Sequence, residues 1–204
     1  MSERAYLYPG WLRLWHWTNA ILIIGLTASG ISLHYSNPQV GLIEFDIARD
    51  VHNACGVALC GAYAVFFVGN IVTGNWWQFV PHPHRYASRA WLQMRFYMWD
   101  IFFGRPHPFP PTPESNFNPL QQVFYWAVMY LLMPALLLTG IIFLYPDLAP
   151  DHVFGFDGLL PVAMAHYMVA FLIVCFMVMH IYLGTTGLHV TTLFRAMATG
   201  WHED

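Results

Sequence analysis

Four long apolar runs constrain this chain more than any other feature of its sequence. They cover roughly residues 14–35, 51–73, 120–145 and 160–185, and they contain almost no charge. A helix of about 20 apolar residues is long enough to cross the hydrocarbon core of a bilayer. Only 9% of the residues are charged, against about 25% in a typical soluble domain. The sequence therefore predicts an all-α integral membrane protein, with a bundle of four transmembrane helices forming a single domain over residues 1–204.

The placement of arginine predicts the topology. All eight basic residues are arginine, and seven lie before the first run, after the fourth, or between the second and third. Arg49 lies in one of the other two connections. Those connections carry the acidic residues Glu44, Asp46, Asp50, Asp147, Asp151 and Asp157. The positive-inside rule then places both termini in the cytoplasm. The N-terminus lacks the order of a cleaved signal peptide, so we expect the first apolar run to be retained as a span. We therefore expect a multi-pass protein of the bacterial inner membrane that contacts lipid.

The long cytoplasmic connection begins with a distinctive segment. Residues 85–103, RYASRAWLQMRFYMWDIFF, alternate arginines with bulky aromatic residues. This pattern is typical of a helix that lies in the membrane interface, with arginines at the headgroups. The prolines that follow predict a loop. No basic cluster indicates nucleic-acid binding, and no CxxCH motif indicates covalent haem attachment.

Histidine is the residue type that carries chemistry in this chain. Seven histidines lie in loops, at span ends or near the C-terminus, where we expect solvated or headgroup-facing side chains: His34, His82, His84, His107, His152, His189 and His202. The other four are His16, His52, His166 and His180, and they lie within the membrane boundaries. A polar side chain is costly there, so a functional role is the default interpretation.

The spacing of these four histidines predicts two pairs. His166 and His180 are 14 residues apart, which corresponds to about 21 Å along a helix and to directions within about 40° of each other. His16 begins the first span at the cytoplasmic face, whereas His52 begins the second at the outer face. Depth therefore pairs His52 with His166 and His16 with His180. Each pair can supply two axial imidazoles to the iron of one haem b, a centre suited to electron transfer.

Other polar and small residues fit this interpretation. Arg13 and Arg49 lie at the two membrane edges, and they are candidate partners for haem propionates. Five glycines give the first two spans small surfaces, where a helix or a flat macrocycle can approach closely: Gly25, Gly30, Gly56, Gly61 and Gly69.

Two other classes of protein stay open on the residues alone. One is an intramembrane metalloenzyme whose histidines bind zinc or iron, although such sites usually cluster their ligands, as in HExxH. The other is a cofactor-free membrane anchor or a transporter whose histidines line a pathway.

Several segments resemble one family. YLYPGWLRLWHWTNA around His16, and the spacing of His166 and His180, are similar to the membrane cytochrome b subunits of respiratory formate dehydrogenases, nickel–iron hydrogenases and thiosulfate reductases. GNWWQFVP, RPHPFPPTPESNFNPLQQ and HIYLGTTGLHVTTLFRAMATGW most resemble the thiosulfate-reductase type.

The resemblance implies a four-helix fold with two b haems and a quinone site beside the inner haem. Asn118 and Gln121 match residues at that site, although Asn118 would also suit a helix N-cap. The family also implies an extracytoplasmic partner, an iron–sulfur or multihaem cytochrome c subunit of a larger oxidoreductase complex. In such a complex this chain transfers electrons and anchors the partner, and another subunit converts the substrate.

A reduced-minus-oxidised absorption spectrum of the purified protein separates these three classes. We expect b-type bands and two haems per chain, because two histidine pairs lie at two depths. A correctly folded chain without haem would contradict this interpretation.

Overall fold

Four long helices form the transmembrane part of the molecule. In the computed structural model these are α1 (Gly10–His34), α2 (Phe45–Thr73), the combined segment Pro119–Leu144 and α6 (Leu159–Gly184), each long and apolar enough to cross a membrane. The predicted spans agree with these helices to within a few residues, except that α2 begins six residues earlier than residue 51. The structure describes residues 4–36, 42–81, 83–112, 115–153, 155–187 and 189–203, so the expectation for His82 lies outside it.

The third span is not a uniform helix. It consists of α4 (Pro119–Ala127), a π-helical segment η3 (Val128–Leu132) and α5 (Met133–Leu144). Pro134 explains the break, since it lacks an N–H and its ring clashes with the carbonyl one turn earlier. The hydroxyl of Tyr63 on α2 donates to the carbonyl of Met129 at 2.9 Å. A neighbouring helix therefore satisfies a backbone group at the irregular turn, as a membrane interior requires.

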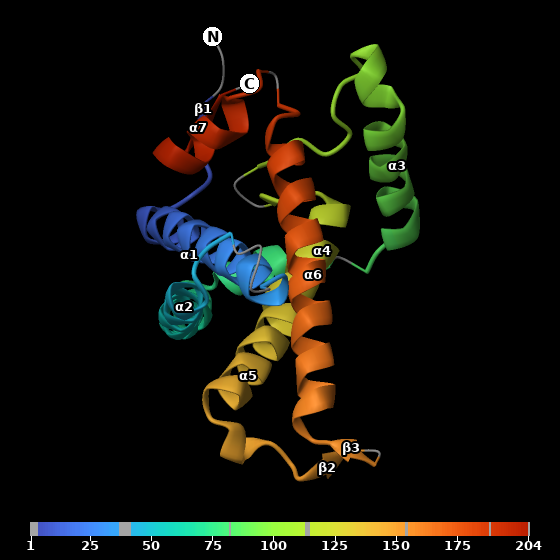
Figure 1. The fold of residues 1–204 in the computed structure, drawn as a ribbon. Coiled ribbons are helices and arrows are strands. Elements are labelled where there is room, and N and C mark those ends of the chain that lie inside the picture. The colour runs from blue at the N-terminus through green and yellow to red at the C-terminus, as the bar shows by residue number, and fades with distance from the viewer. Residues whose placement is uncertain are drawn as a thin grey trace.

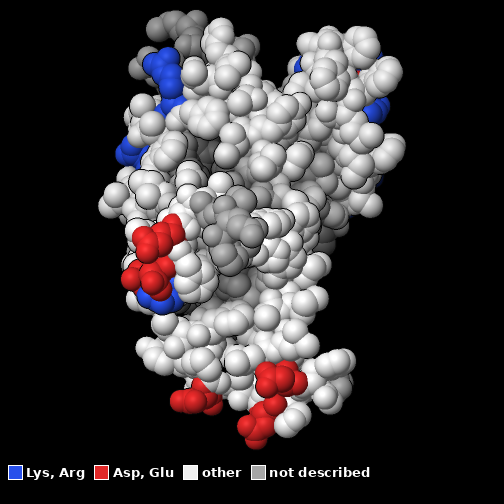
Figure 2. All heavy atoms as spheres, viewed as in Figure 1, with Lys and Arg blue, Asp and Glu red and all other residues white. Residues whose placement is uncertain are grey.

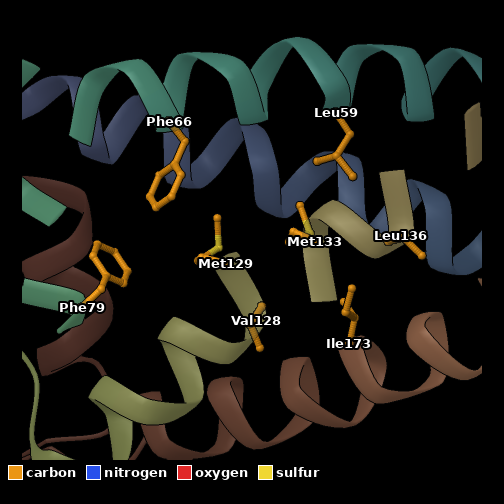
Figure 3. Packing of buried hydrophobic residues seen from close by; sticks show 8 residues of the cluster. All are labelled: Leu59, Phe66, Phe79, Val128, Met129, Met133, Leu136 and Ile173. Atoms are coloured by element: carbon orange, nitrogen blue, oxygen red, sulfur yellow. The ribbon is translucent and has the colours of Figure 1, made fainter. Parts of the chain in front are cut away.

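The apolar core is narrow and lies between the helices. Leu59 and Phe66 from α2 and Ile173 from α6 point toward the third span (Figure 3). The eight buried residues of this cluster are Leu59, Phe66, Phe79, Val128, Met129, Met133, Leu136 and Ile173. Most other large apolar side chains on the four helices are exposed, and Ile173 is the buried residue of α6. Helices that stay apolar on their outer faces are suited to lipid rather than to water.

Shorter elements lie at the two ends of the bundle (Figure 1). At one end β1 (Arg4–Tyr6) pairs antiparallel with β4 (Trp201–Glu203), next to α7 (Thr192–Thr199). At the other end η4 (Pro146–Leu148) leads into the hairpin of β2 (His152–Val153) and β3 (Phe156–Asp157). The long connection contains η1 (Asn75–Phe79), α3 (Tyr86–Met98) and η2 (Asp100–Phe103).

The predicted helix over residues 85–103 is therefore two pieces in the structure. The chain changes direction at Trp99, between α3 and η2. The carboxylate of Asp100, which is only 5% exposed, holds this corner through contacts of 3.0 Å with Arg95 and Arg105. The placement of α3 in the membrane interface stays a prediction.

Charge is distributed unevenly along the bundle. On the face that Figure 2 shows, acidic side chains gather in the lower half, whereas arginines lie mainly near the chain termini and α3. Arg49 lies among acidic residues and contacts Asp46 at 2.8 Å and Asp50 at 3.0 Å. On that face most acidic side chains thus lie apart from most of the arginines.

The five glycines expected at close approaches behave in two ways. A Cβ at Gly25 would lie 3.2 Å from Cys55, one at Gly30 would lie 3.3 Å from His52, and one at Gly69 would lie 2.7 Å from Trp11. Gly56 and Gly61 have no described neighbour within 4 Å of that position. The contact between α1 and α2 is thus tightest at Gly69.

This difference predicts opposite effects of two alanine substitutions on α2. Gly69→Ala should lower the melting temperature, since overpacking against Trp11 costs about 1–3 kcal/mol. Gly61→Ala is the matched control and should hold or raise the melting temperature, because alanine is favoured over glycine in a helix by about 1 kcal/mol. Thermal unfolding of the detergent-solubilised protein by circular dichroism measures both. Equal melting temperatures would contradict the packing argument.

Candidate functional site

His16 on α1 lies beside His180 on α6. Their ring centres are 5.9 Å apart with an interplanar angle of 55°. The hydroxyl of Tyr125 on α4 lies 3.2 Å from Nδ1 of His180. The ring of Phe176 stacks on the His180 ring, with 5.6 Å between the ring centres. Nδ1 of His16 is buried without a partner among the described residues. We call His16 and His180 the inner pair.

His52 on α2 lies beside His166 on α6, and we call these two the outer pair. Their ring centres are 6.4 Å apart with an interplanar angle of 68°. Nδ1 of His52 lies 3.0 Å from the hydroxyl of Ser29 on α1. Nδ1 of His166 lies 2.8 Å from the hydroxyl of Thr139 on α5. Each outer histidine is therefore held by a hydroxyl from the helix that precedes it in the chain.

Both pairs have the separation that two axial ligands need. Imidazoles on opposite sides of one metal, each bonded at about 2 Å, have ring centres roughly 6 Å apart. Where Nδ1 is engaged, Nε2 is left as the ligand atom. Within the described residues, no group of three or more His, Cys, Asp or Glu side chains is placed to hold a metal ion. The candidate ligands form two separate pairs of histidines, and their role as iron ligands stays a prediction.

The two candidate propionate partners already contact protein groups. Arg13 donates from one terminal nitrogen to the carbonyl of Ala198, at the end of α7, over 2.6 Å. Its Nε is buried without a partner in the described part of the chain. Arg49 is half-exposed and paired with Asp46 and Asp50. Both arginines lie three residues before a paired histidine, in R-L-W-H and R-D-V-H. Arg13 thus joins the two ends of the chain as well as lying near the inner pair.

Asn118 and Gln121 form a capping box at the start of α4. The side-chain oxygen of Asn118 accepts from the backbone N–H groups of Leu120 and Gln121, and the oxygen of Gln121 accepts from the N–H of Asn118 at 3.1 Å. The amide nitrogen of Asn118 donates to Tyr97 at 2.8 Å. The N-cap role considered for Asn118 is therefore present. Among described residues, no partner contacts the amide nitrogen of Gln121.

Two of the remaining histidines are not solvated as expected. His107 packs against the ring of Phe96 at 4.7 Å, and its Nδ1 accepts from the N–H of Phe109. Burial lowers its pKa, so the ring is neutral at pH 7. His202 is only 7% exposed, in the strand β4. The interpretation failed there because contacts between distant segments cover these positions.

Three site residues were missed by the sequence analysis: Ser29, Thr139 and Tyr125. Each places a hydroxyl on a paired histidine. Ser29 and Thr139 each stand directly before a glycine within an apolar run. That shared pattern, at the depth of His52 and His166, was the signal that could have identified them.

Comparison with known proteins identifies the family. The model of the prokaryotic cytochrome b561 family matches residues 7–200. The putative cytochrome YdhU of Escherichia coli (strain K12) is 40% identical over 207 residues, covering 99% of this chain and 76% of that protein. Probable Ni/Fe-hydrogenase B-type cytochrome subunits match from Azotobacter vinelandii, 25% identical over 96% of this chain and 87% of that protein, and from Rhodobacter capsulatus, 26% identical over 66% and 53%.

The chain therefore belongs to the prokaryotic cytochrome b561 family. It is a multi-pass membrane protein that transfers electrons by means of b-type haem. The resemblance to membrane cytochrome b subunits of respiratory oxidoreductases is thus confirmed. The closer similarity to the thiosulfate-reductase type stays a prediction.

Proposed function

We propose that the chain is a two-haem membrane subunit that carries electrons between the quinone pool and an extracytoplasmic redox partner, and that it anchors this partner to the membrane. The observation that carries the proposal is the arrangement of four intramembrane histidines as two pairs, with ring centres 5.9 Å and 6.4 Å apart. A pair of this kind is the ligand set of a low-spin haem.

His16 and His180 would hold the inner haem, and His52 and His166 the outer one. A b-type haem supplies a one-electron centre whose potential depends on its ligands and their hydrogen bonds. Arg13 and Arg49 are the proposed propionate partners, since each lies one helical turn before a proposed ligand. Nε of Arg13 is buried and has no partner among the described residues, which favours an anionic group on that side.

We place the quinone site at the start of α4. Gln121 and Tyr125 are four residues apart, so they share one face of the helix. Tyr125 contacts the inner-pair histidine His180. The amide nitrogen of Gln121 can donate to a quinone carbonyl while its oxygen stays in the capping box. Asn118 supports this site by holding the helix start and Tyr97.

The partner is proposed for the end with the acidic loops. The Azotobacter and Rhodobacter relatives are named as hydrogenase subunits, which favours a larger oxidoreductase complex. An iron–sulfur or multihaem cytochrome c subunit would approach the outer pair there. Because His166 and His180 are separated by about 21 Å along α6, turnover that joins a cytoplasmic-side quinone to this partner moves charge across the bilayer. Each unit charge couples to about 2.3 kcal/mol per 100 mV.

Histidine substitutions test the pairing. His52→Ala and His166→Ala should remove the same redox component, and His16→Ala and His180→Ala should remove the other. The physical reason is that one imidazole cannot complete a two-ligand haem site. Redox titration of each purified variant measures this. Loss of one common component in His16→Ala and His166→Ala, with the other intact, would refute the pairing.

A substitution at Gln121 tests the quinone site without breaking the helix start. Gln121→Glu keeps an oxygen for the capping box but removes the amide donor. We expect retained haem, with reduction by quinol analogues falling at least tenfold. Asn118→Ser is the companion variant, because serine also caps helices but cannot reproduce the amide contact with Tyr97. Haem content, quinol reduction and artificial-donor activity are measured separately in the intact complex. Normal quinol reduction in Gln121→Glu would remove Gln121 from the site.

A further inference from the structure

The two outer histidines face the same short sequence on two different helices. Residues 26–30 of α1 read LTASG, and residues 136–140 of α5 read LLLTG. Both have the form Leu-x-x-Ser/Thr-Gly. In each case the hydroxyl oxygen contacts Nδ1 of a histidine in the first third of the following helix, at 3.0 Å for His52 and 2.8 Å for His166. The recurrence in two helical hairpins suggests a shared task rather than chance packing.

The direction of these hydrogen bonds follows from counting protons. The Ser29 hydroxyl donates its single proton to the carbonyl of Gly25 at 2.7 Å. The Thr139 hydroxyl donates in the same way to the carbonyl of Ala135 at 2.8 Å. Each hydroxyl oxygen must then accept from the imidazole. Nδ1 of each outer histidine therefore carries the proton, and Nε2 presents its lone pair.

The glycine of each sequence leaves room for the edge of the ring. A Cβ at Gly30 would lie 3.3 Å from Cε1 of His52, and one at Gly140 would lie 3.5 Å from Cε1 of His166. The first contact would be tight and the second an ordinary van der Waals contact, so the edge of each ring packs directly against a glycine. Each Ser/Thr-Gly dipeptide therefore contacts both Nδ1 and the edge of one imidazole.

The inner pair is held differently. His180 meets a tyrosine hydroxyl at 3.2 Å, and Nδ1 of His16 is buried without a partner among the described residues. Only the outer pair has both Nδ1 atoms engaged by hydroxyls whose own protons are bound to the backbone.

We propose that Ser29 and Thr139 are positioning residues that hold His52 and His166 as Nε2 ligands and lower the redox potential of the outer haem. This inference rests on the proposed function. A proton on Nδ1 that is shared with an oxygen makes the imidazole a stronger donor to iron, which favours the oxidised state. Among the described residues the inner pair has no equivalent pair of contacts, so we expect the effect at the outer haem alone.

Redox titration and low-spin electron paramagnetic resonance of the full-length protein test the inference. We compare Ser29→Ala and Thr139→Val with the conservative variants Ser29→Thr and Thr139→Ser. Thr73→Val is the matched control, because Thr73 bonds the carbonyl of Gly69 at 2.7 Å and contacts no described histidine. The outer component is identified as the one that His166→Ala removes.

The hydroxyl deletions should shift the outer potential upward, while the inner component and the Thr73→Val protein stay unchanged. The conservative variants should restore the potential of the native protein. Loss of the outer haem in the deletions, with retention in the conservative variants, would equally support positioning. An unshifted potential and spectrum in both deletions would overturn the inference, as would conservative variants that behave like deletions. A native protein with fewer than two haems would instead overturn the proposed function.

Discussion

An imidazole inside a bilayer has to satisfy both ring nitrogens, because the hydrocarbon offers neither donors nor acceptors. In this chain the requirement is met by pairing helices. The hydroxyl of Ser29 on α1 serves His52 on α2, and that of Thr139 on α5 serves His166 on α6. Each contact joins two antiparallel helices that are consecutive in the transmembrane bundle. The contact at one nitrogen thus joins the two helices of a hairpin and leaves the other nitrogen as the candidate ligand atom.

The two hairpins are equivalent in their outer half and different in their inner half. If α2 repeated α6, the residue 14 positions after His52 would be a histidine, but it is Phe66, which belongs to the buried core. If the third span repeated α1, the residue 13 positions before Thr139 would be a histidine, but it is Trp126. The inner pair therefore combines the first helix of one hairpin with the second helix of the other. This pair therefore connects the two hairpins at the depth where their sequences are no longer equivalent.

The sequence was sufficient for the features that depend on length, period and depth. Apolar runs located the four spans, and the 14-residue spacing placed His166 and His180 on one face of α6. Features that depend on contacts between distant segments were not predictable in this way. Arg13 contacts Ala198, 185 residues away, and Asn118 contacts Tyr97 from another helix. No local pattern specifies these two partners. Ser29 and Thr139 do share a local pattern, a hydroxyl residue before a glycine, but its meaning depends on the histidine that the fold brings to each hydroxyl.

The two ends of the bundle differ in what they offer a reaction. Around the inner pair lie groups with exchangeable protons, including Tyr97, Gln121 and Tyr125, and burial raises the pKa of Tyr97, which keeps this phenol protonated. At the outer pair the described contacts of the two Nδ1 atoms are the hydroxyls of Ser29 and Thr139, and each of these hydroxyls also bonds a carbonyl of its own helix. Quinone chemistry needs protons as well as electrons, whereas transfer to a protein partner needs electrons alone. This difference fits the proposed quinone site at the inner end and the proposed partner at the outer end, an arrangement that would make turnover electrogenic.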